Sequence, residues 1–447
     1  MDKESSFIFE DENTILFAAS RDSQDTKKVE AGEPYTAYYR IPLNGGEAVK
    51  AFSVPLKASG IWKLDADLYL VKARTDAAIG DFAAMSDEQR EQVMKTKKEN
   101  VDYEVFDEIP FWANGGGFTN KLRNTLYVVD VQANTCTPIT APLFMTGDVD
   151  VKAGQVLYTG EEYTSRPQRK ASVYLYDVKT KTTKCVYDKK EYSIHEARFF
   201  KDQIVLAAAT TTRHGNNENP YLYKLDPATG EVTLWAEYEY SMGSSVGSDC
   251  RYGGGNGFAA DDQALYFLTT REDSSHCYKM EECGCIKPVI ELTGSIDHFA
   301  LADGKILFAG MIGQKLQEIY EYDLETQTTT QISDFNEAAL KDKYVAVPQR
   351  VSVASEGTTI NGWVLLPKDY DPAQKYPAIL DIHGGPKTVY GEVFYHEMQV
   401  WANEGYFVFF CNPIGSDGRD NEFADLRGKY GTCDYQNIMD FTDEVLK

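Results

Sequence analysis

The sequence has no run of 18 consecutive apolar residues, and its 45 basic residues are far outnumbered by 69 acidic ones. A helix that crosses a bilayer needs about 20 apolar residues. A formal net charge of −24 repels both a phosphate backbone and an anionic membrane surface. The N-terminus also lacks the basic region and apolar core of a secretory signal. We therefore expect a cytoplasmic protein that binds neither nucleic acid nor membranes.

Cysteines are few as well, eight in 447 residues, and they are scattered along the chain. This distribution favours reduced thiols over a disulfide framework. One cluster, His276, Cys277, Cys283 and Cys285, could bind a soft metal, but its spacing fits no standard zinc motif. A strand, turn and strand is the simpler interpretation, so we expect no metal and no cofactor.

A short motif recurs six times along the first three quarters of the chain. It contains a strand with a tyrosine, a polar turn and a second strand, as in "LYVVDVQANTCT" and "IYEYDLETQTTT". The tyrosines are 42 to 55 residues apart, except for a first interval of 88 residues. They are Tyr39, Tyr127, Tyr174, Tyr223, Tyr278 and Tyr320. A second series of apolar strands keeps step with them, near Leu16, Tyr69, Tyr158, Leu206, Tyr266 and Leu307.

A period of about 40–50 residues made of short strands is typical of a β-propeller. We predict a mostly β chain with six visible blades in residues 1–344, and a pair of β-sandwiches is the alternative. The long first interval holds an insertion at about 81–120, where the capping-box pattern of Ser86 and Gln89 predicts a helix up to about Lys98. Phe111 and Trp112 at its exit are candidates for a substrate loop, and a packed structural excursion is the alternative.

The pattern changes after residue 344. "AILDI" (378–382) is a near-continuous apolar run, as expected for a parallel strand that is covered on both faces, and "YFVFFCNP" (406–413) is predicted as a second buried strand. Helical spacing predicts a helix over 394–403 and places Ile438, Phe441 and Val445 on one face of a final helix. Alternating strands and helices predict the beginning of an α/β domain over residues 345–447.

Four C-terminal motifs resemble the prolyl oligopeptidase family of serine peptidases, in its acylaminoacyl-peptidase-like branch. They are "DIHGGP" (381–386), "VYGEVFYHEMQVWANEGYFVFFCNP" (389–413), "GSDGR" (415–419) and "FADLRGKYGTCDY" (423–435). The resemblance covers nearly the whole chain. It implies a propeller of seven blades, an α/β-hydrolase domain and the hydrolysis of short peptides of the acylaminoacyl- or aminoacyl-peptidase type. A related esterase of the same fold is an alternative.

The resemblance also implies a nucleophilic serine in a G-x-S-x-G turn after the His-Gly-Gly loop. The match "GSSVG" (243–247) precedes that loop, so Ser245 is interpreted as part of a turn between blades. The catalytic serine, aspartate and histidine are therefore expected beyond Lys447, and this chain alone is expected to be inactive. Because "AILDI" or its neighbour would then present an unpaired apolar edge, we expect the missing hydrolase segment or a second copy of the chain as a partner.

The glycines after His383 let the backbone come close to a substrate. By resemblance, the N–H of Gly385, with that of Gly384, donates to the oxyanion of acyl transfer. A plain strand-end turn is the alternative. His383 is interpreted as a loop-shaping residue, and Arg419 as a further substrate-loop candidate.

Two positions depart from the family pattern. Ile414 stands where an arginine is usual, and Asp420 stands where a glycine is usual. The second change is expected to strain a tight turn. The departures support an alternative function, a non-catalytic propeller that binds peptides or a protein partner and retains a vestigial hydrolase segment.

Overall fold

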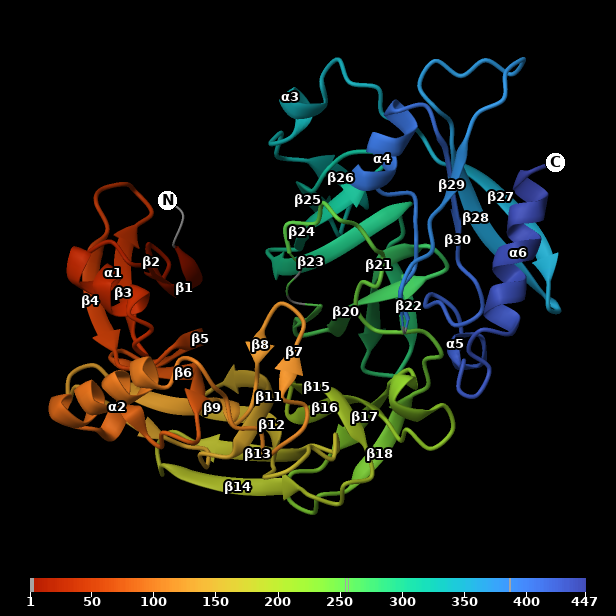
Figure 1. The fold of residues 1–447 in the computed structure, drawn as a ribbon. Coiled ribbons are helices and arrows are strands. Elements are labelled where there is room, and N and C mark those ends of the chain that lie inside the picture. The colour runs from red at the N-terminus through yellow and green to blue at the C-terminus, as the bar shows by residue number, and fades with distance from the viewer. Residues whose placement is uncertain (1–3, 254, 256, 386) are drawn as a thin grey trace. The chain divides into compact units, whose positions relative to one another are not determined.

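The computed structural model describes residues 4–253, 255, 257–385 and 387–447. Over these residues, six successive four-stranded sheets are followed by a four-stranded sheet of different topology, and a two-stranded sheet lies in the insertion (Figure 1). Pro386, the last residue of the His-Gly-Gly-Pro motif, lies outside the described residues. The six predicted repeats are confirmed as six sheets.

The first three sheets each pair their strands antiparallel and in chain order. Their strands are β1 (Ser5–Asp11), β2 (Thr14–Ala18), β3 (Thr36–Pro42), β4 (Val49–Val54), β5 (Ala58–Asp65), β6 (Leu68–Asp76), β9 (Leu122–Asp130), β10 (Thr135–Pro138), β11 (Phe144–Lys152), β12 (Gln155–Glu162), β13 (Ser172–Asp177) and β14 (Thr182–Tyr187). Helix α1 (Ser23–Glu30) connects β2 to β3.

The next three sheets also keep the chain order of their strands. Their strands are β15 (Ser193–Phe200), β16 (Gln203–Ala209), β17 (Tyr221–Leu225), β18 (Val232–Ala236), β19 (Phe258–Ala260), β20 (Ala264–Arg271), β21 (Ser274–Glu281), β22 (Ile286–Ile290), β23 (Gly294–Ala302), β24 (Lys305–Ile312), β25 (Glu318–Asp323) and β26 (Thr328–Gln331). A short 3₁₀ turn (Gly215–Asn217) lies between β16 and β17.

The two sequence series mark the two central strands of each sheet. Tyr158 of β12 pairs with Tyr174 of β13, and their rings stack at a centroid distance of 5.1 Å. A central strand has a hydrogen-bonded neighbour on both sides, so its backbone is satisfied while its side chains enter the core. Leu16, Tyr69 and Leu206 are fully buried accordingly.

The chain divides into two compact units. The first comprises residues up to 199 with 203–206 and 225–232, and the second comprises 200–202, 207–224 and 233–447. This division passes through the fourth sheet, β15–β18. A domain boundary at residue 344 stays a prediction.

The insertion belongs to the first unit and connects β6 to β9. It contains a 3₁₀ turn (Phe82–Ala84), α2 (Asp87–Glu99), β7 (Trp112–Ala113) and β8 (Gly117–Phe118). The Gln89 N–H donates to Ser86 Oγ (3.3 Å) and the Ser86 N–H donates to Gln89 Oε1 (2.8 Å). The predicted capping box and its helix are therefore confirmed.

The last sheet belongs to the second unit and has the order β27-β28-β30-β29. Its strands are β27 (Gln349–Ser355), β28 (Thr358–Leu365), β29 (Ala378–Leu380) and β30 (Phe407–Cys411). The pair β29–β30 is parallel, with α4 (His396–Asn403) between the two strands in the chain. The short α3 (Glu337–Leu340) precedes the sheet, and α5 (Asn421–Ala424) and α6 (Cys433–Val445) follow it.

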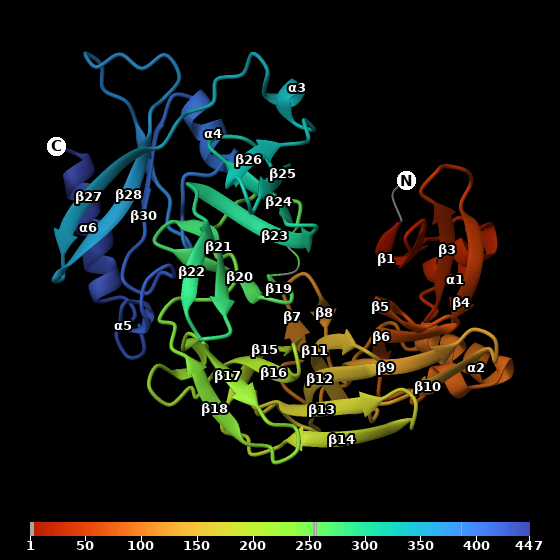
Figure 2. The ribbon, with the colours of Figure 1, turned by 180° about the vertical axis from the view of Figure 1, so that it is seen from behind.

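Helices α4 and α6 cover opposite faces of this sheet. Alternate residues of a strand point to opposite faces. Trp363 and Phe410 accordingly form one core cluster with Met398 of α4. Val364 and Phe409 form another cluster with Phe441 of α6. Helix α6 lies against β27 and β28 (Figure 1 and Figure 2). The predicted face of the final helix, Ile438, Phe441 and Val445, is confirmed.

The prediction that residues 378–382 are buried on both faces is wrong. β29 comes last in the sheet order, so among the described residues it has one hydrogen-bonded strand neighbour. Ala378 is exposed, Ile379 and Leu380 are half-buried, and Ile382 beyond the strand is 57% exposed. An apolar run indicates burial, but it does not tell how many strands lie beside it.

Two further observations bear on the sequence expectations. Cys283 and Cys285 form a disulfide in the turn between β21 and β22, so the expectation that all thiols are reduced is wrong for this pair. Because these cysteines are two residues apart in a tight turn, their sulfur atoms can meet.

In the part of the chain that the structure describes, no helix combines the length and the apolar character that a membrane span requires.

Candidate functional site

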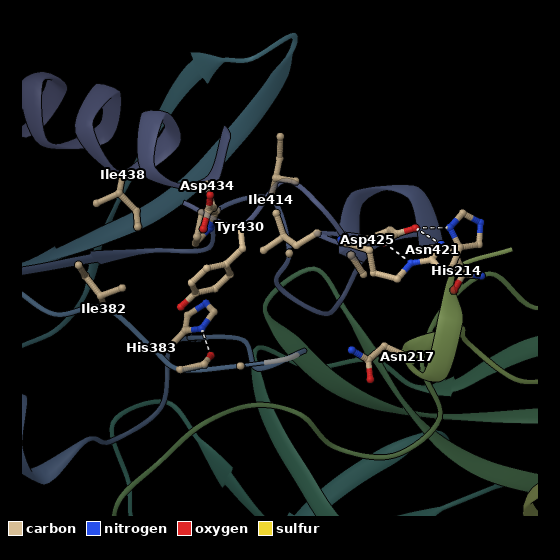
Figure 3. A pocket seen from close by; sticks show the side chains of 17 residues that line it. His214, Asn217, Ile382, His383, Ile414, Asn421, Asp425, Tyr430, Asp434 and Ile438 are labelled. Carbon is tan, nitrogen blue, oxygen red and sulfur yellow. Dashed lines mark hydrogen bonds and ion pairs between the residues drawn. The ribbon is translucent and has the colours of Figure 1, made fainter. Parts of the chain in front are cut away.

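A cavity of about 440 Å³ opens beside the His-Gly-Gly loop, inside the second unit. Figure 3 shows Ile382, His383 and Tyr430 on one side of this cavity and His214, Asn421 and Asp425 on the other. The other lining residues are Asn217, Gly384, Gly385, Pro413, Ile414, Gly415, Ala424, Leu426, Arg427, Asp434 and Ile438.

The parallel strands of the last sheet bring two of the lining segments together. β29 ends at Leu380 and leads into residues 382–385, while β30 ends at Cys411 and leads into residues 413–415. The carboxyl ends of parallel strands meet at the same sheet edge, where ligands of open α/β sheets bind. The cavity therefore lies where this topology favours a binding site.

His383 connects the two loops through its ring. Nδ1 lies 2.7 Å from the Gly384 carbonyl oxygen, and Nε2 lies 3.0 Å from Ser416 Oγ. Burial lowers the pKa of His383, so the ring is neutral at pH 7. A carbonyl oxygen only accepts, hence Nδ1 carries the proton and Nε2 accepts from the Ser416 hydroxyl. Both ring nitrogens are thus engaged in shaping the loop.

Gly384 and Gly385 present bare backbone at the cavity. Both residues are exposed, and neither has a positive φ. A Cβ on Gly384 would meet nothing within 4 Å, and on Gly385 the nearest atom would be Lys387 N at 3.7 Å. Among the described residues, no hydrogen bond uses either N–H as donor. These amides can therefore donate to a bound oxygen.

Charged residues form the opposite wall. Arg427 donates to both carboxylate oxygens of Asp425, at 2.9 Å from Nε and 2.7 Å from a terminal nitrogen. These bonds hold the pKa of Asp425 well below its usual range. His214 donates from Nδ1 to the same carboxylate at 3.2 Å, and Arg427 also donates to the Arg213 carbonyl.

The other predicted site residues, Arg419, Phe111 and Trp112, are not among the residues that line this cavity. Arg419 donates to Thr358 Oγ1 (3.2 Å) and to the Thr359 carbonyl (3.1 Å), and its guanidinium stacks on the Phe423 ring. Phe111 and Trp112 belong to the first unit, where they are 42% and 52% exposed on or next to β7. Whether these three residues contact a substrate stays a prediction.

Ser245 lies in the loop between the fourth and fifth sheets, as its sequence context predicts. Its hydroxyl donates to Asp417, and its carbonyl accepts from the Val389 N–H at 3.2 Å. The described residues that follow it form no helix before α3. The strand-to-helix geometry of a nucleophile elbow is therefore absent at this described position.

The two departures from the family pattern are accommodated. Asp420 has φ −67° and caps α5, because its side chain accepts from the Phe423 N–H at 2.9 Å. The expected strain at Asp420 is therefore wrong: this turn does not use the left-handed region that glycine would favour. Ile414 lines the cavity, and its N–H donates to Asn437 Oδ1 at 3.0 Å.

Several residues at the site could not be singled out from the sequence. His214 is isolated in the chain, yet it contacts Asp425, which is 211 residues away. Asp425, Arg427 and Tyr430 do fall within the motif "FADLRGKYGTCDY", which carried the resemblance without a role for each residue. That motif is the signal that could have pointed to this wall.

Comparisons with known proteins identify similar sequences. Residues 392–447 match the model of the Prolyl oligopeptidase family. The chain is 26% identical over 424 residues to the uncharacterized peptidase YuxL of Bacillus subtilis, covering 92% of this chain and 63% of that protein. The present chain therefore spans less than two thirds of that relative.

Solved structures show the same fold. An acylaminoacyl peptidase from Pyrococcus horikoshii superposes with a TM-score of 0.74 at 19% identity, over 100% of this chain and 63% of that one. An acylaminoacyl peptidase in complex with Z-Gly-Gly-Phe-chloromethyl ketone matches with the same TM-score and identity, over 100% and 64% of the two chains. The fold is a mostly β propeller followed by the first part of an α/β-hydrolase domain.

Proposed function

We propose, from the premise that this chain belongs to the prolyl oligopeptidase family, that it contributes the oxyanion-binding loop of a serine peptidase. This peptidase hydrolyses short peptides, of the acylaminoacyl- or aminoacyl-peptidase type, through an acyl-enzyme. The catalytic serine, aspartate and histidine come from residues outside this chain, as does a seventh propeller blade. The 447-residue chain alone is therefore inactive.

The observation that carries the proposal is the exposed backbone of Gly384 and Gly385 at the cavity. A tetrahedral intermediate needs preorganised N–H donors aimed at its oxyanion. The Gly385 N–H supplies one, with Gly384 beside it, and the N–H after the nucleophilic serine supplies the other. Because His383 uses one ring nitrogen on Gly384 and the other on Ser416, it positions these amides and is not the general base.

The edge of β29 supports a place for the remaining hydrolase segment. Among the described residues, no strand pairs with its outer side, and a further parallel strand there would cover the exposed and half-buried residues Ala378, Ile379 and Leu380. We infer that this segment, joined to the chain or supplied separately, is the partner of this edge. A second copy of the chain takes its place when the segment is missing.

The decisive experiment joins or co-expresses this chain with the C-terminal hydrolase segment of the Bacillus relative and assays acyl-peptide and aminoacyl chromogenic substrates. Hydrolysis is expected only when both parts are present. Gly385→Pro, which removes the N–H, should lower kcat by about 10²- to 10³-fold. Gly385→Ala is the matched control, because it keeps the N–H and its Cβ would meet no atom closer than 3.7 Å.

Two outcomes would contradict the proposal. If the purified 447-residue chain cleaved peptides and a serine-directed phosphonate blocked that activity, the nucleophile would lie within the chain. If the combined protein folded but hydrolysed none of these substrates while still binding peptides, the alternative of a non-catalytic propeller would take its place. The residue Ile414, an apolar side chain at the cavity where the family has an arginine, favours testing that alternative directly.

A further inference from the structure

We infer that Lys387 is a positioning residue that holds the Gly384–Gly385 amides in place by tying the oxyanion loop to Asn217, Asn219 and Asp417. The inference rests on the proposed function, since it concerns the same amides. Lys387 follows Gly385 by two residues, and its side chain is 15% exposed. It belongs to the second unit, as do its three partners.

The Lys387 ammonium faces three oxygen acceptors. Nζ donates to the Asn217 carbonyl at 3.2 Å and to the Asn219 side-chain oxygen, and it lies 3.7 Å from Asp417 Oδ1. An ammonium has three donors and no acceptor. Three converging oxygens therefore match the charged form. Burial lowers the pKa of Lys387, while the Asp417 carboxylate acts in the opposite direction.

Asp417 is itself held firmly in place. Its side chain is 1% exposed, and Oδ2 accepts hydrogen bonds from Ser241 (2.6 Å) and Ser245. Oδ1 has no hydrogen bond within 3.5 Å among the described residues, which leaves Lys387 as its cationic neighbour. A buried carboxylate needs a nearby positive charge to offset its desolvation, so separating Lys387 from Asp417 would be unfavourable.

The backbone after Lys387 is anchored to the same elements. The Asp417 N–H donates to the Thr388 carbonyl (3.2 Å), the Val389 N–H donates to the Ser245 carbonyl (3.2 Å), and the Gly247 N–H donates to the Val389 carbonyl (2.8 Å). On the other side of the glycines, the His383 ring contacts Ser416. Gly384 and Gly385 thus lie between two anchors, His383 directly before them and Lys387 two residues after Gly385.

The backbone of Lys387 adds a reason for the anchor. Its φ is +58°, in the left-handed region that disfavours residues with a Cβ. Such a conformation persists where the surroundings hold it. The three acceptors around Nζ supply that hold, and without them the loop would relax toward other conformations.

The first test uses hydrogen exchange on the 447-residue chain, which needs no activity. Lys387→Met should speed exchange of the Val389 and Asp417 amides by about tenfold or more, because the Val389 N–H and the Thr388 carbonyl that accepts from Asp417 move with the loop. Lys387→Asn, which tolerates a positive φ but lacks the ammonium, should behave in the same way. Exposed Lys375→Met is the matched control and should leave both amides unchanged. Unchanged exchange in Lys387→Met overturns the inference.

The second test uses the combined protein and separates positioning from mere stability. Lys387→Met should lower kcat by about tenfold with KM nearly unchanged, since only transition-state contacts are lost. In a double-mutant cycle, adding Lys387→Met to Gly385→Pro should cause little further loss, because both act through one donor. Losses that multiply would overturn the inference. An inactive wild-type combination would instead refute the proposed function, and the exchange experiment would still decide on Lys387.

Discussion

The repeated sheets and the C-terminal sheet differ in how their strands are joined. In each of the six repeated sheets, strands pair in chain order, and even the long insertion between β6 and β9 leaves that order intact. In the C-terminal sheet, β30 lies between β28 and β29, so the chain leaves the sheet, forms α4 and returns. Chain-order pairing is a local property, whereas the second arrangement depends on contacts between distant residues.

The edges of the two kinds of sheet differ as well. Burial in the repeated sheets centres on their inner strands, as in β20, where residues 264–270 are all buried. The outer strand β29 of the C-terminal sheet carries apolar residues that the described chain covers only in part. The outer strand of the C-terminal sheet therefore offers an apolar surface for a further strand.

The largest expected effect concerns the C-terminal core. Trp363 is fully buried, stacks on Phe410 at 5.5 Å and donates from Nε1 to Glu392 at 3.0 Å. Trp363→Ala should lower the free energy of unfolding by about 3–5 kcal/mol. Hydrogen exchange should show the loss of protection in β28 and β30.

Leu157→Ala is the matched change in the repeated sheets, because Leu157 of β12 is also fully buried. It should cost about 2–5 kcal/mol and expose β12 and β13 instead. If both variants opened the same amides to the same extent, the two parts would unfold as one unit and the comparison would fail.

The second prediction concerns the open edge of β29. The chain alone should self-associate at tens of micromolar, because unpaired backbone groups and apolar side chains template further pairing. Ile379→Lys should weaken this association by about tenfold or more, as charged edge residues do in natural sheets. Light scattering and sedimentation measure it. Val400→Lys on α4, at a residue 41% exposed, is the control and should not change the association.

The third prediction concerns α2 in the insertion, and it tests whether capping hydrogen bonds or tertiary contacts stabilise this helix. Helix α2 buries none of its residues, so its capping box carries much of its stability. Ser86→Ala should cost about 1 kcal/mol of helix stability, while Ser86→Asp should retain the cap. Exchange of the α2 amides should report the change. Equal exchange in both variants would show that the cap contributes nothing.

The smallest effect is expected from pH, at the exposed wall of the cavity. The Asp425 carboxyl has a folded-state pKa below its unfolded value, because Arg427 stabilises the charged form. Its contribution to stability is therefore complete above about pH 4 and is lost as the pH falls further. Wild type should lose more stability between pH 5 and pH 3 than Asp425→Asn does. Identical pH dependence in thermal unfolding would contradict this assignment, and added salt should reduce the difference.

Much of the repeated part could be predicted from the sequence. The tyrosine and apolar series mark the central strands because a blade pairs neighbours in the chain, so the period of the sequence is the period of the structure. The capping box of α2 was equally readable, since its bonds join residues three positions apart. The apolar face of α6 followed from helical spacing alone.

The C-terminal part could be predicted less completely. The motif around His383 indicated a loop with bare backbone, but it did not indicate the contact of the His383 ring with Ser416, which is 33 residues away. The burial of "AILDI" was overestimated because hydropathy carries no information on sheet position. At Asp420, strain was expected from residue type, whereas the observed φ of −67° removes it.

Periodic spacing and a local capping pattern were thus enough to predict the blades and the inserted helix, because both involve residues close together in the chain. The cavity, the Lys387–Asp417 pair and the contact of His214 with Asp425 emerged only from the folded chain. They join groups that are 30 to 211 residues apart in the sequence. No local pattern encodes such a meeting, since it depends on the packing of every element in between.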